Sequence, residues 1–328
     1  MTMSRVVVFD EFGGPEVLKV REEPVAAPAA GEVRVRIEAF AVNPLDVMAR
    51  SGSSPAPVQL PGARLGVEGS GIVDAVGPDV ASLRVGDPVI FAAVPDAAER
   101  GTYADHVVVP ASRVLPRPDG LDAIEAAAVW VGYSTAYGAL VETARMRPGD
   151  RILITAASGS VGRAAIQLAN HLGAEPIAVT RSAGKATLLR DAGAATVIAH
   201  DAGDLGEQVL SRTGGEGVDI AFDLVGGPGV ESLSRGIRPD GALVLAGFLD
   251  PRPAPLPFAP STIRRYRSFD HTLDPAAVRR MAAFLAAAVR AGALHPAVER
   301  VFGFEQVAAA HAHVASGAHQ GGKIVVTT

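Results

Sequence analysis

The stretch "RILITAASGSVGRAAIQLANHLG", residues 151–173, decides the fold. It opens with an apolar run, continues through a turn of small residues at 155–162, and ends with the periodicity of an amphipathic helix. A strand, a tight turn and a helix in this order can hold a phosphate, because the N–H groups of the helix's first turn point at the anion. Aligned to the pattern G-x-G-x-x-G, the turn has alanine at the first position, Ala157, and glycine at the other two, Gly159 and Gly162.

Strand and helix patterns alternate after this turn. We predict strands over 151–155, 176–180, 196–200, 218–225 and 242–248, and helices over 161–173, 184–193, 205–214 and 229–237. The alternation is typical of a doubly wound parallel sheet and favours a dinucleotide site over a turn that serves packing alone. A Walker loop and a nucleophile elbow are both excluded, since no Gly-Lys-Ser/Thr follows and no G-x-S-x-G surrounds Ser158 or Ser160.

The first 120 residues follow a different pattern. Alternating or β-branched runs, separated by Gly, Pro and Asp, predict strands over 4–12, 32–42, 69–76, 86–93 and 102–110, which favour a partly open β-barrel. After the proline-rich segment 250–260, a helix over 275–291 and the tail 321–328 are expected to return to this barrel. We therefore expect a discontinuous catalytic domain: its first part is 1–121, the inserted nucleotide-binding domain is 122–260, and 261–328 completes both the sheet and the catalytic domain.

The amino-acid composition excludes several classes of function. The 328 residues fit two domains better than one. Thirty basic and 35 acidic residues give an evenly spread charge of −5, and only 5% of the residues are aromatic, so we expect no nucleic-acid partner. Cysteine is absent, which excludes disulfides, a thiol nucleophile and thiolate-bound zinc. Since the chain has neither an apolar run of 18 residues nor the features of a signal peptide, we expect a cytoplasmic protein with no membrane partner.

The end of the second predicted strand indicates which dinucleotide binds. An NAD site places Asp or Glu there to bind the ribose 2′-hydroxyl. Here the strand runs instead into Thr180, Arg181 and Ser182, with Lys185 one turn later. Each charge-assisted hydrogen bond to a 2′-phosphate contributes about 1.5 to 3 kcal/mol, so two of them change affinity by roughly two to four decades. We therefore predict NADPH as the cofactor, the alternative being a solvated basic strand end.

The whole chain resembles the medium-chain dehydrogenase/reductase superfamily, and within it the zinc-free quinone oxidoreductase branch that contains ζ-crystallin-like enzymes. The segments that carry the resemblance run in order along the chain: "FGGPEVLKV", "AVNPLDVMARSG", "GVEGSGIVDAVG", "GDPVIF", "GTYADHVVVP", "STAYGAL", the nucleotide-binding turn, "FDLVGG" and "GGKIVV". The resemblance implies an α/β fold in which a Rossmann domain is inserted in a GroES-like, partly open β-barrel catalytic domain.

The sequence departs from the zinc-dependent members of that superfamily at the metal ligands. Where those members carry a cysteine, this chain has Asn43-Pro44-Leu45-Asp46, and where they carry Gly-His-Glu it has Gly66-Val67-Glu68. The four-cysteine structural lobe is missing as well. We therefore predict no metal site, and a reaction that delivers hydride to a carbon that is already electrophilic.

The resemblance also implies site residues. Expected at the cofactor are Asn43, Thr135, Ser158, Gly159, Ser160, Val161, Gly162, Thr180, Arg181, Ser182, Lys185, His200, Val225, Gly247, Phe248, Leu249 and Lys323. Asn43 and Tyr133 are the candidate catalytic donors, their alternatives being a turn residue and a packing residue. Met48, Trp130 and Tyr133 are candidates for the substrate side. His311 and His313 lie two apart on a predicted helix and share no face, so they are not expected to form a metal pair.

These expectations define an NADPH-dependent reductase of quinones or α,β-unsaturated carbonyl compounds, with a quinone or enone as its small-molecule partner. Two alternatives stay open: an enoyl thioester reductase or tailoring reductase of a biosynthetic pathway, and a non-catalytic NADPH-binding sensor or structural protein. A homodimer is the family expectation, with the apolar strand 242–248 as the edge that pairs two chains.

Overall fold

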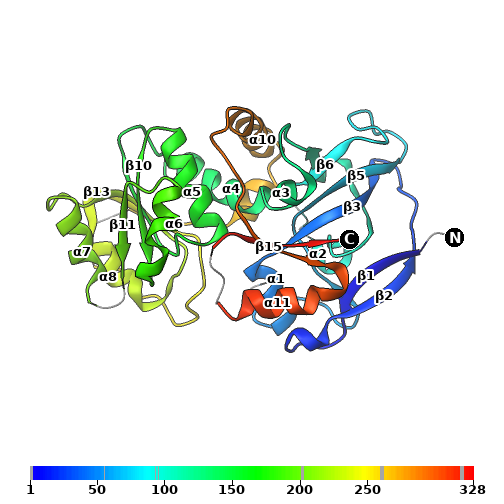
Figure 1. Ribbon diagram of the computed structural model, residues 1–328, viewed down its shortest axis with the longest axis horizontal. Coiled ribbons are helices and arrows are strands. Elements are labelled where there is room, and N and C mark those ends of the chain that lie inside the picture. Colours follow the sequence, from blue (N-terminus) through cyan, green and yellow to red (C-terminus); the bar gives the residue numbers. More distant parts are fainter. Residues whose placement is uncertain are drawn as a thin grey trace. The chain divides into compact units, whose positions relative to one another are not determined.

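The computed structural model describes residues 3–54, 56–92, 94, 96–200, 203–258, 262–317 and 321–328. The chain forms two compact units (Figure 1). Unit 1 comprises Met1–Val131, Pro275–Arg290 and His295–Thr328, and unit 2 comprises Gly132–Asp274 and Ala291–Leu294. Unit 1 extends past residue 121 because helix α3 (Ala123–Ala127) packs on its strands. The functional domains 1–121, 122–260 and 261–328 stay a prediction.

Unit 1 is built from two sheets. A seven-stranded sheet has the order β15-β16-β3-β5-β6-β8 with β7 also paired to β3, and a three-stranded sheet has the order β2-β1-β4. The strands are β1 (Met3–Phe9), β2 (Lys19–Pro24), β3 (Glu32–Val42), β4 (Ala63–Arg64), β5 (Gly69–Val76), β6 (Pro88–Phe91), β7 (His106–Pro110), β8 (Val114–Pro116), β15 (Val298–Gly303) and β16 (Lys323–Thr327). Each predicted strand is present, although the one expected over 102–110 begins only at His106. The sequence missed β2, which lies exposed along β1 and so has no alternating apolar pattern.

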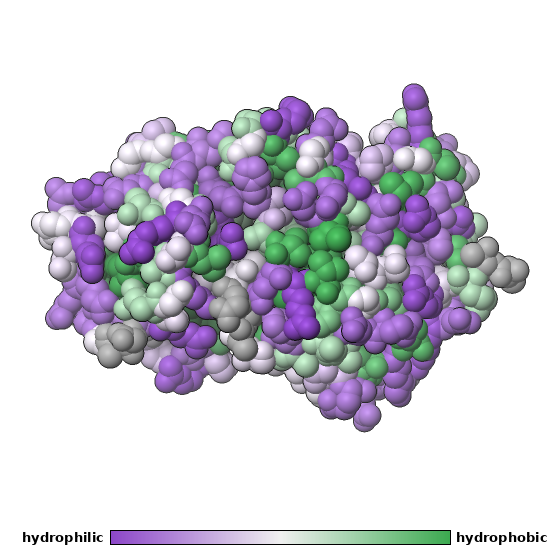
Figure 2. Space-filling view, viewed as in Figure 1, coloured by the Kyte–Doolittle hydropathy of each residue, from purple (hydrophilic) through white to green (hydrophobic). Residues whose placement is uncertain are grey.

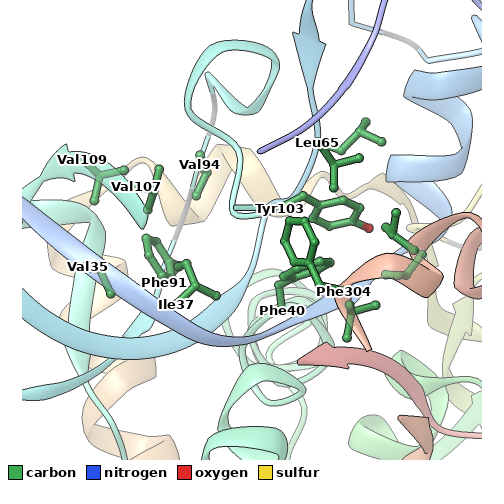
Figure 3. Close-up of a cluster of buried hydrophobic side chains, with 14 of the residues drawn as sticks. Val35, Ile37, Phe40, Leu65, Phe91, Val94, Tyr103, Val107, Val109 and Phe304 are labelled. Atoms are coloured by element: carbon green, nitrogen blue, oxygen red, sulfur yellow. The ribbon is translucent and has the colours of Figure 1, made fainter. Parts of the chain in front are cut away.

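The core of unit 1 is aromatic and β-branched. Alternate residues of β3 point inward, as the period-2 pattern predicts. Figure 3 shows this cluster, in which the rings of Phe40 and Tyr103 stack with centroids 4.2 Å apart and Phe304 meets Phe40 edge-on. Burial of these large side chains supplies the main stabilisation of the unit.

Helices complete unit 1. They are α1 (Pro44–Ser51), α2 (Ala97–Arg100), α3, α10 (Pro275–Arg290) and α11 (Val307–Ala315), with single turns η1 (Pro15–Val17), η2 (Ala111–Arg113) and η6 (Phe304–Gln306). Helix α1 begins at Asn43 because Pro44 suits the first helical position and Asp46 caps the Asn43 N–H, and it ends at the left-handed Gly52. Helix α10 forms where the sequence predicts it. Helix α4 (Trp130–Tyr137) starts at the end of unit 1's first segment and continues into unit 2.

Unit 2 is a six-stranded parallel sheet with helices between its first five strands, which confirms the predicted doubly wound fold. The order β11-β10-β9-β12-β13-β14 places the third, second and first strands on one side of the switch and the fourth to sixth on the other. Its strands are β9 (Arg151–Ile154), β10 (Glu175–Thr180), β11 (Thr196–Ala199), β12 (Val218–Asp223), β13 (Ile237–Leu245) and β14 (Thr262–Arg265). Its further helices and turns are α5 (Ser160–His171), α6 (Ala186–Asp191), α7 (Leu205–Arg212), α8 (Val230–Arg235), α9 (Ser268–Thr272), η3 (Gly138–Thr143), η4 (Ala183–Lys185) and η5 (Gly227–Gly229).

The edge of this sheet differs from the prediction. Strand β14 pairs in parallel with β13, Leu243 opposite Ile263, so the apolar strand expected at the edge lies between two others. The expectation that 242–248 pairs two chains is therefore wrong. Strand β14 is not predicted by the sequence, because its four residues are all exposed and the segment "TIRR" has no alternation of apolar and polar residues.

The surface is mainly hydrophilic, as the charged residues of both signs in the composition lead one to expect. Hydrophilic side chains cover most of the face in Figure 2, with apolar ones in small groups between them. None of the helices in the described part of the chain is long and apolar enough to cross a membrane.

Candidate active site

The turn after β9 has the shape of a phosphate cradle. Helix α5 begins at Gly159 with no side chain capping it, so no side chain competes with an anion for the N–H groups of its first turn. Gly162 lets the helix approach the strand, because a Cβ there would lie 2.5 Å from Ala157 Cα. These residues fit the pyrophosphate of a dinucleotide, and Ser158, Ser160 and Val161 lie on the same turn, half-buried.

The neighbouring turn after β12 is fixed by a polar pair that sequence reasoning missed. Thr155 Oγ1 donates to Asp223 Oδ1 at 2.7 Å and accepts from the Leu224 N–H at 2.8 Å. The same carboxylate accepts from the N–H groups of Val225 and Gly226. Strands β9 and β12 flank the switch point of the sheet, where ligands of such folds bind. The pair could have been inferred from the sequence, because Thr155 and Asp223 each stand near the carboxyl end of a predicted strand.

The turn after β13 approaches the turn after β12 closely. A Cβ at Gly247 would lie 1.8 Å from Leu224 O, so only glycine fits. Phe248 and Leu249 follow with 49% and 54% of their surfaces exposed, which is unusual for large apolar side chains. They are apolar surface available to a ligand at this edge of the sheet.

The basic loop after β10 lies where the sequence places it. Thr180 ends the strand, buried, and its hydroxyl accepts from the Ser182 N–H at 3.3 Å. Arg181 is exposed and has no ion pair with any residue that the structure describes, and Lys185 ends the short turn η4. His200, after β11, donates its backbone N–H to Thr180 O at 2.8 Å, and its ring Nδ1 lies 3.3 Å from Gln208 Nε2. The residues expected at the 2′-phosphate and the adenine ribose all lie in unit 2, at or after the ends of β10 and β11.

Unit 1 holds the second group of site residues, and it is a buried cluster of charges. Lys323 Nζ lies 2.7 Å from Glu68 Oε1 and donates to Asn43 Oδ1 at 2.7 Å. Asn43 Nδ2 donates in turn to Glu68 Oε1 at 3.0 Å. Asp46 accepts from the backbone N–H groups of Asn43 at 2.8 Å and Gly66 at 3.1 Å. The sequence singled out Asn43 and Lys323, but it gave Glu68 and Asp46 no role.

Burial changes the acid–base behaviour of this region. Desolvation raises the pKa of Asp46 to about 6, and the Glu68 charge adds to that rise, whereas two backbone N–H groups and Lys323 oppose it. Desolvation also raises the pKa of Tyr103 well above 10 and lowers the pKa of His311 to about 3. His311 is therefore neutral at physiological pH, and its Nε2 lies 3.2 Å from the Tyr103 hydroxyl.

The remaining expected residues are more enclosed than the sequence implies. Tyr133 is 3% exposed, and its hydroxyl donates to Gln167 Oε1 at 2.6 Å within unit 2. Trp130 is buried in unit 1, and its Nε1 has no hydrogen-bond partner among the described residues. Met48 is half-buried on α1, and Thr135 is buried on α4.

His311 and His313 do not lie together in a metal-binding arrangement. His311 is buried against Tyr103, and His313 Nε2 lies 2.9 Å from Glu299. Within the described ranges, no group of three or more His, Cys, Asp or Glu side chains could hold a metal ion.

A β-rich unit combined with a doubly wound dinucleotide-binding unit is the architecture of the two-domain dehydrogenases and reductases. Residues 29–119 match the alcohol dehydrogenase GroES-like domain, and residues 160–287 match the domain family described as zinc-binding dehydrogenase. The chain belongs to the medium-chain dehydrogenase/reductase superfamily, in its quinone oxidoreductase branch. It is therefore an oxidoreductase of the kind that binds a nicotinamide cofactor.

Individual relatives agree with this placement. The chain is 38% identical over 245 residues to a quinone oxidoreductase of Pseudomonas aeruginosa, which covers 75% of this chain and 74% of that protein. It is 30% identical over 322 residues to a 2-haloacrylate reductase of a Burkholderia species, covering 95% and 96%. The crystal structure of Escherichia coli quinone oxidoreductase complexed with NADPH matches with a TM-score of 0.90 and 27% identity, covering 99% of this chain and 100% of that chain.

Proposed function

We propose that the protein is an NADPH-dependent reductase that transfers hydride, without zinc, to a quinone or an α,β-unsaturated carbonyl compound. The observation that carries the proposal is the loop after β10, where Arg181 and Lys185 lie with two hydroxyl side chains and the next carboxylate in sequence is Asp191. A 2′-phosphate is the part of the cofactor that such a loop recognises, because cations and hydroxyls donate to its oxygens. The names of the relatives support the reaction class.

The cofactor contacts follow from the elements of unit 2. We assign the pyrophosphate to the cradle Ser158–Gly162, and the 2′-phosphate to Thr180, Arg181, Ser182 and Lys185. His200 would meet the adenine ribose. Val225, Gly247, Phe248 and Leu249 would line the nicotinamide ribose, and Asn43, Thr135 and Lys323 would serve the nicotinamide end. When bound, NADPH supplies the hydride.

The chain's own contribution is to orient the reactants and to stabilise charge. Reduction of a conjugated carbonyl places negative charge on oxygen, which hydrogen-bond donors stabilise. The structure shows one N–H of the Asn43 amide donating to Glu68, while the second lies 3.4 Å from Ala41 O and can serve a substrate. The Tyr133 hydroxyl donates its one proton to Gln167, so Tyr133 must exchange that partner first. The proton is then supplied by Tyr133 or by water. Holding two reactants face to face supplies much of the acceleration.

A panel of acceptors tests the reaction. NADPH absorbance is followed with a quinone, a 2-haloacrylate, an enone and an enoyl thioester in parallel. We expect oxidation with the quinone or the simple conjugated acceptors. Turnover with the enoyl thioester alone would favour a biosynthetic enoyl reductase, and tight NADPH binding without any oxidation would indicate a sensor or structural protein. Both results contradict the proposal.

We also propose that the protein forms a homodimer in the cytoplasm. Among the residues that the structure describes, strand β14 pairs only with β13, so its other side offers backbone groups to a second copy, and Ile263 on it is 36% exposed. Light scattering at micromolar concentration should give twice the mass of one chain. A monomer at that concentration contradicts the dimer.

A further inference from the structure

The Lys323 ammonium is the most enclosed cation of unit 1 that pairs with a carboxylate. The Lys323 side chain is 3% exposed and that of Glu68 is 0% exposed. They come from segments 255 residues apart in the sequence, because Lys323 opens β16 and Glu68 precedes β5. Burying two such charges costs several kcal/mol each, which their attraction only partly returns. Stability alone therefore does not account for the pair, since two apolar side chains would serve as well.

Both carboxylate oxygens of Glu68 have partners. Oε1 receives the Lys323 ammonium and the Asn43 amide, and Oε2 accepts from the Val131 N–H at 2.8 Å. Glu68 O is held as well, by the Thr102 hydroxyl at 2.8 Å. Val131 lies at the start of α4, where a carboxylate is favoured by the helix dipole. Glu68 therefore has one position, and that position fixes Lys323 and Asn43 together.

The Lys323 ammonium is not saturated by this arrangement. An ammonium has three N–H donors. Two of them reach Glu68 and Asn43, and Nζ has no third acceptor among the residues that the structure describes. A buried donor without an acceptor is unfavourable, and more so when it is charged, so the site favours a ligand that brings an oxygen.

We propose that Glu68 is a positioning residue for the reduction: it holds the buried Lys323 side chain in place and orients the free ammonium N–H toward a carbonyl oxygen of a bound ligand. The inference rests on the proposed function. It assigns a fixed cation to the two segments, Asn43–Asp46 and Gly66–Glu68, that stand where the zinc-dependent relatives carry metal ligands. The carbonyl oxygen belongs either to the nicotinamide carboxamide or to the acceptor, whose oxygen gains negative charge as hydride arrives.

The lysine content makes the inference directly measurable. Lys19, Lys185 and Lys323 are the chain's lysines, so lysine labelled with ¹⁵N at Nζ gives three side-chain signals, of which the Lys323→Met variant identifies one. We expect the Lys323 signal of the wild-type protein to shift on addition of a ligand. A shift with NADPH alone identifies the carboxamide, and a shift only with NADP⁺ and an unreactive ketone identifies the acceptor. No shift with either overturns the proposal, whether or not the protein reduces quinones.

Kinetics separate positioning from folding. Glu68→Gln keeps the shape of the side chain and removes its charge, and we expect kcat to fall about tenfold to a hundredfold. The KM for NADPH should stay nearly unchanged if the acceptor receives the ammonium N–H, and should rise if the nicotinamide carboxamide receives it. Lys323→Met should lower kcat at least as far. Glu32→Gln is the matched control, because Glu32 also pairs with a cation in unit 1, Arg100 at 2.6 Å, outside the cluster. If folded Glu68→Gln turns over within twofold of wild type, Glu68 is not a positioning residue. If Glu68→Gln does not fold, the proposal is judged on the wild-type protein alone, by whether the Lys323 ¹⁵N signal shifts when a ligand is added.

Discussion

The Thr155 hydroxyl and the Asp223 carboxylate join the carboxyl ends of β9 and β12 through a buried 2.7 Å hydrogen bond. The two residues are 68 positions apart, and together they hold the N–H groups of the turn 224–226. The phosphate cradle follows β9 directly, so this pair fixes both sides of the switch point before any ligand binds. Preorganisation of this kind reduces the ordering that binding requires.

We predict that Thr155→Val weakens both folding and cofactor binding. Valine has nearly the shape of threonine but leaves Asp223 and the Leu224 N–H without their partner, which should lower the free energy of unfolding by about 1 to 3 kcal/mol. Urea unfolding measures the change, and fluorescence titration measures the NADPH dissociation constant. Thr187→Val, at an exposed position of α6, should stay within about 0.5 kcal/mol of wild type. Equal stability of the two variants would show that the pair is dispensable.

A methyl group at Gly162 should damage the cradle. Its Cβ would lie 2.5 Å from Ala157 Cα and 2.7 Å from Ala157 O, so α5 must move away from the turn. We expect Gly162→Ala to weaken NADPH binding at least about tenfold, equivalent to about 1.4 kcal/mol. Gly229→Ala is the control, because no atom lies within 4 Å of its added Cβ and its φ of −61° suits alanine. Calorimetric titration of both variants checks the prediction, which unchanged affinity in Gly162→Ala would refute.

Arg181 should distinguish the two nicotinamide cofactors. Arg181→Ala removes one cation from the loop after β10, and we expect the dissociation constant for NADPH to rise roughly tenfold to a hundredfold while that for NADH stays within twofold. Arg190→Ala, an exposed arginine on α6, provides the matched loss of charge. A parallel loss of affinity for both cofactors would place Arg181 away from the 2′-phosphate.

The pKa of Asp46 predicts a pH dependence of stability. Its folded-state value of about 6 lies above the ordinary 3.8, so the folded protein binds this proton more tightly than the unfolded chain. The stabilising effect is complete below pH 3.8 and is lost as pH rises through 6, a change of about 3 kcal/mol at 1.36 kcal/mol per pKa unit. The wild-type advantage over Asp46→Asn should therefore shrink by most of that amount between pH 4 and pH 7.5 in urea unfolding.

The control for that measurement is Asp240→Asn, since Asp240 is exposed on β13. Its difference from wild type should stay constant over the same pH range. If the difference for Asp46→Asn is equally constant, the buried carboxyl does not take up a proton in this range.

The sequence predicts the elements better than it predicts their partners. Most parallel strands of unit 2 could be predicted, because each is an apolar run and a segment with helical periodicity separates it from the next. The cradle could be predicted because Gly159 and Gly162 belong to a short local motif. Strand β14 is not visible, because its pairing with β13 is made by backbone atoms and leaves its side chains in water.

The same holds for the charged residues of the site: some could be identified from the sequence, but their contacts could not. Asn43 and Lys323 could be named from short motifs, but their mutual contact spans 280 residues and no local pattern reports it. Glu68 and Asp223 each look like an ordinary carboxylate in the sequence. Only the sheet order, which brings distant strands together, gives them partners.

Cofactor preference with a reducible quinone tests the central claim most directly. We predict that kcat/KM for NADPH exceeds that for NADH by about a hundredfold or more, as the loss of two charge-assisted contacts requires. A kcat/KM that is equal for the two cofactors, or higher for NADH, would contradict the assignment of the loop Thr180–Lys185 and the account built on it.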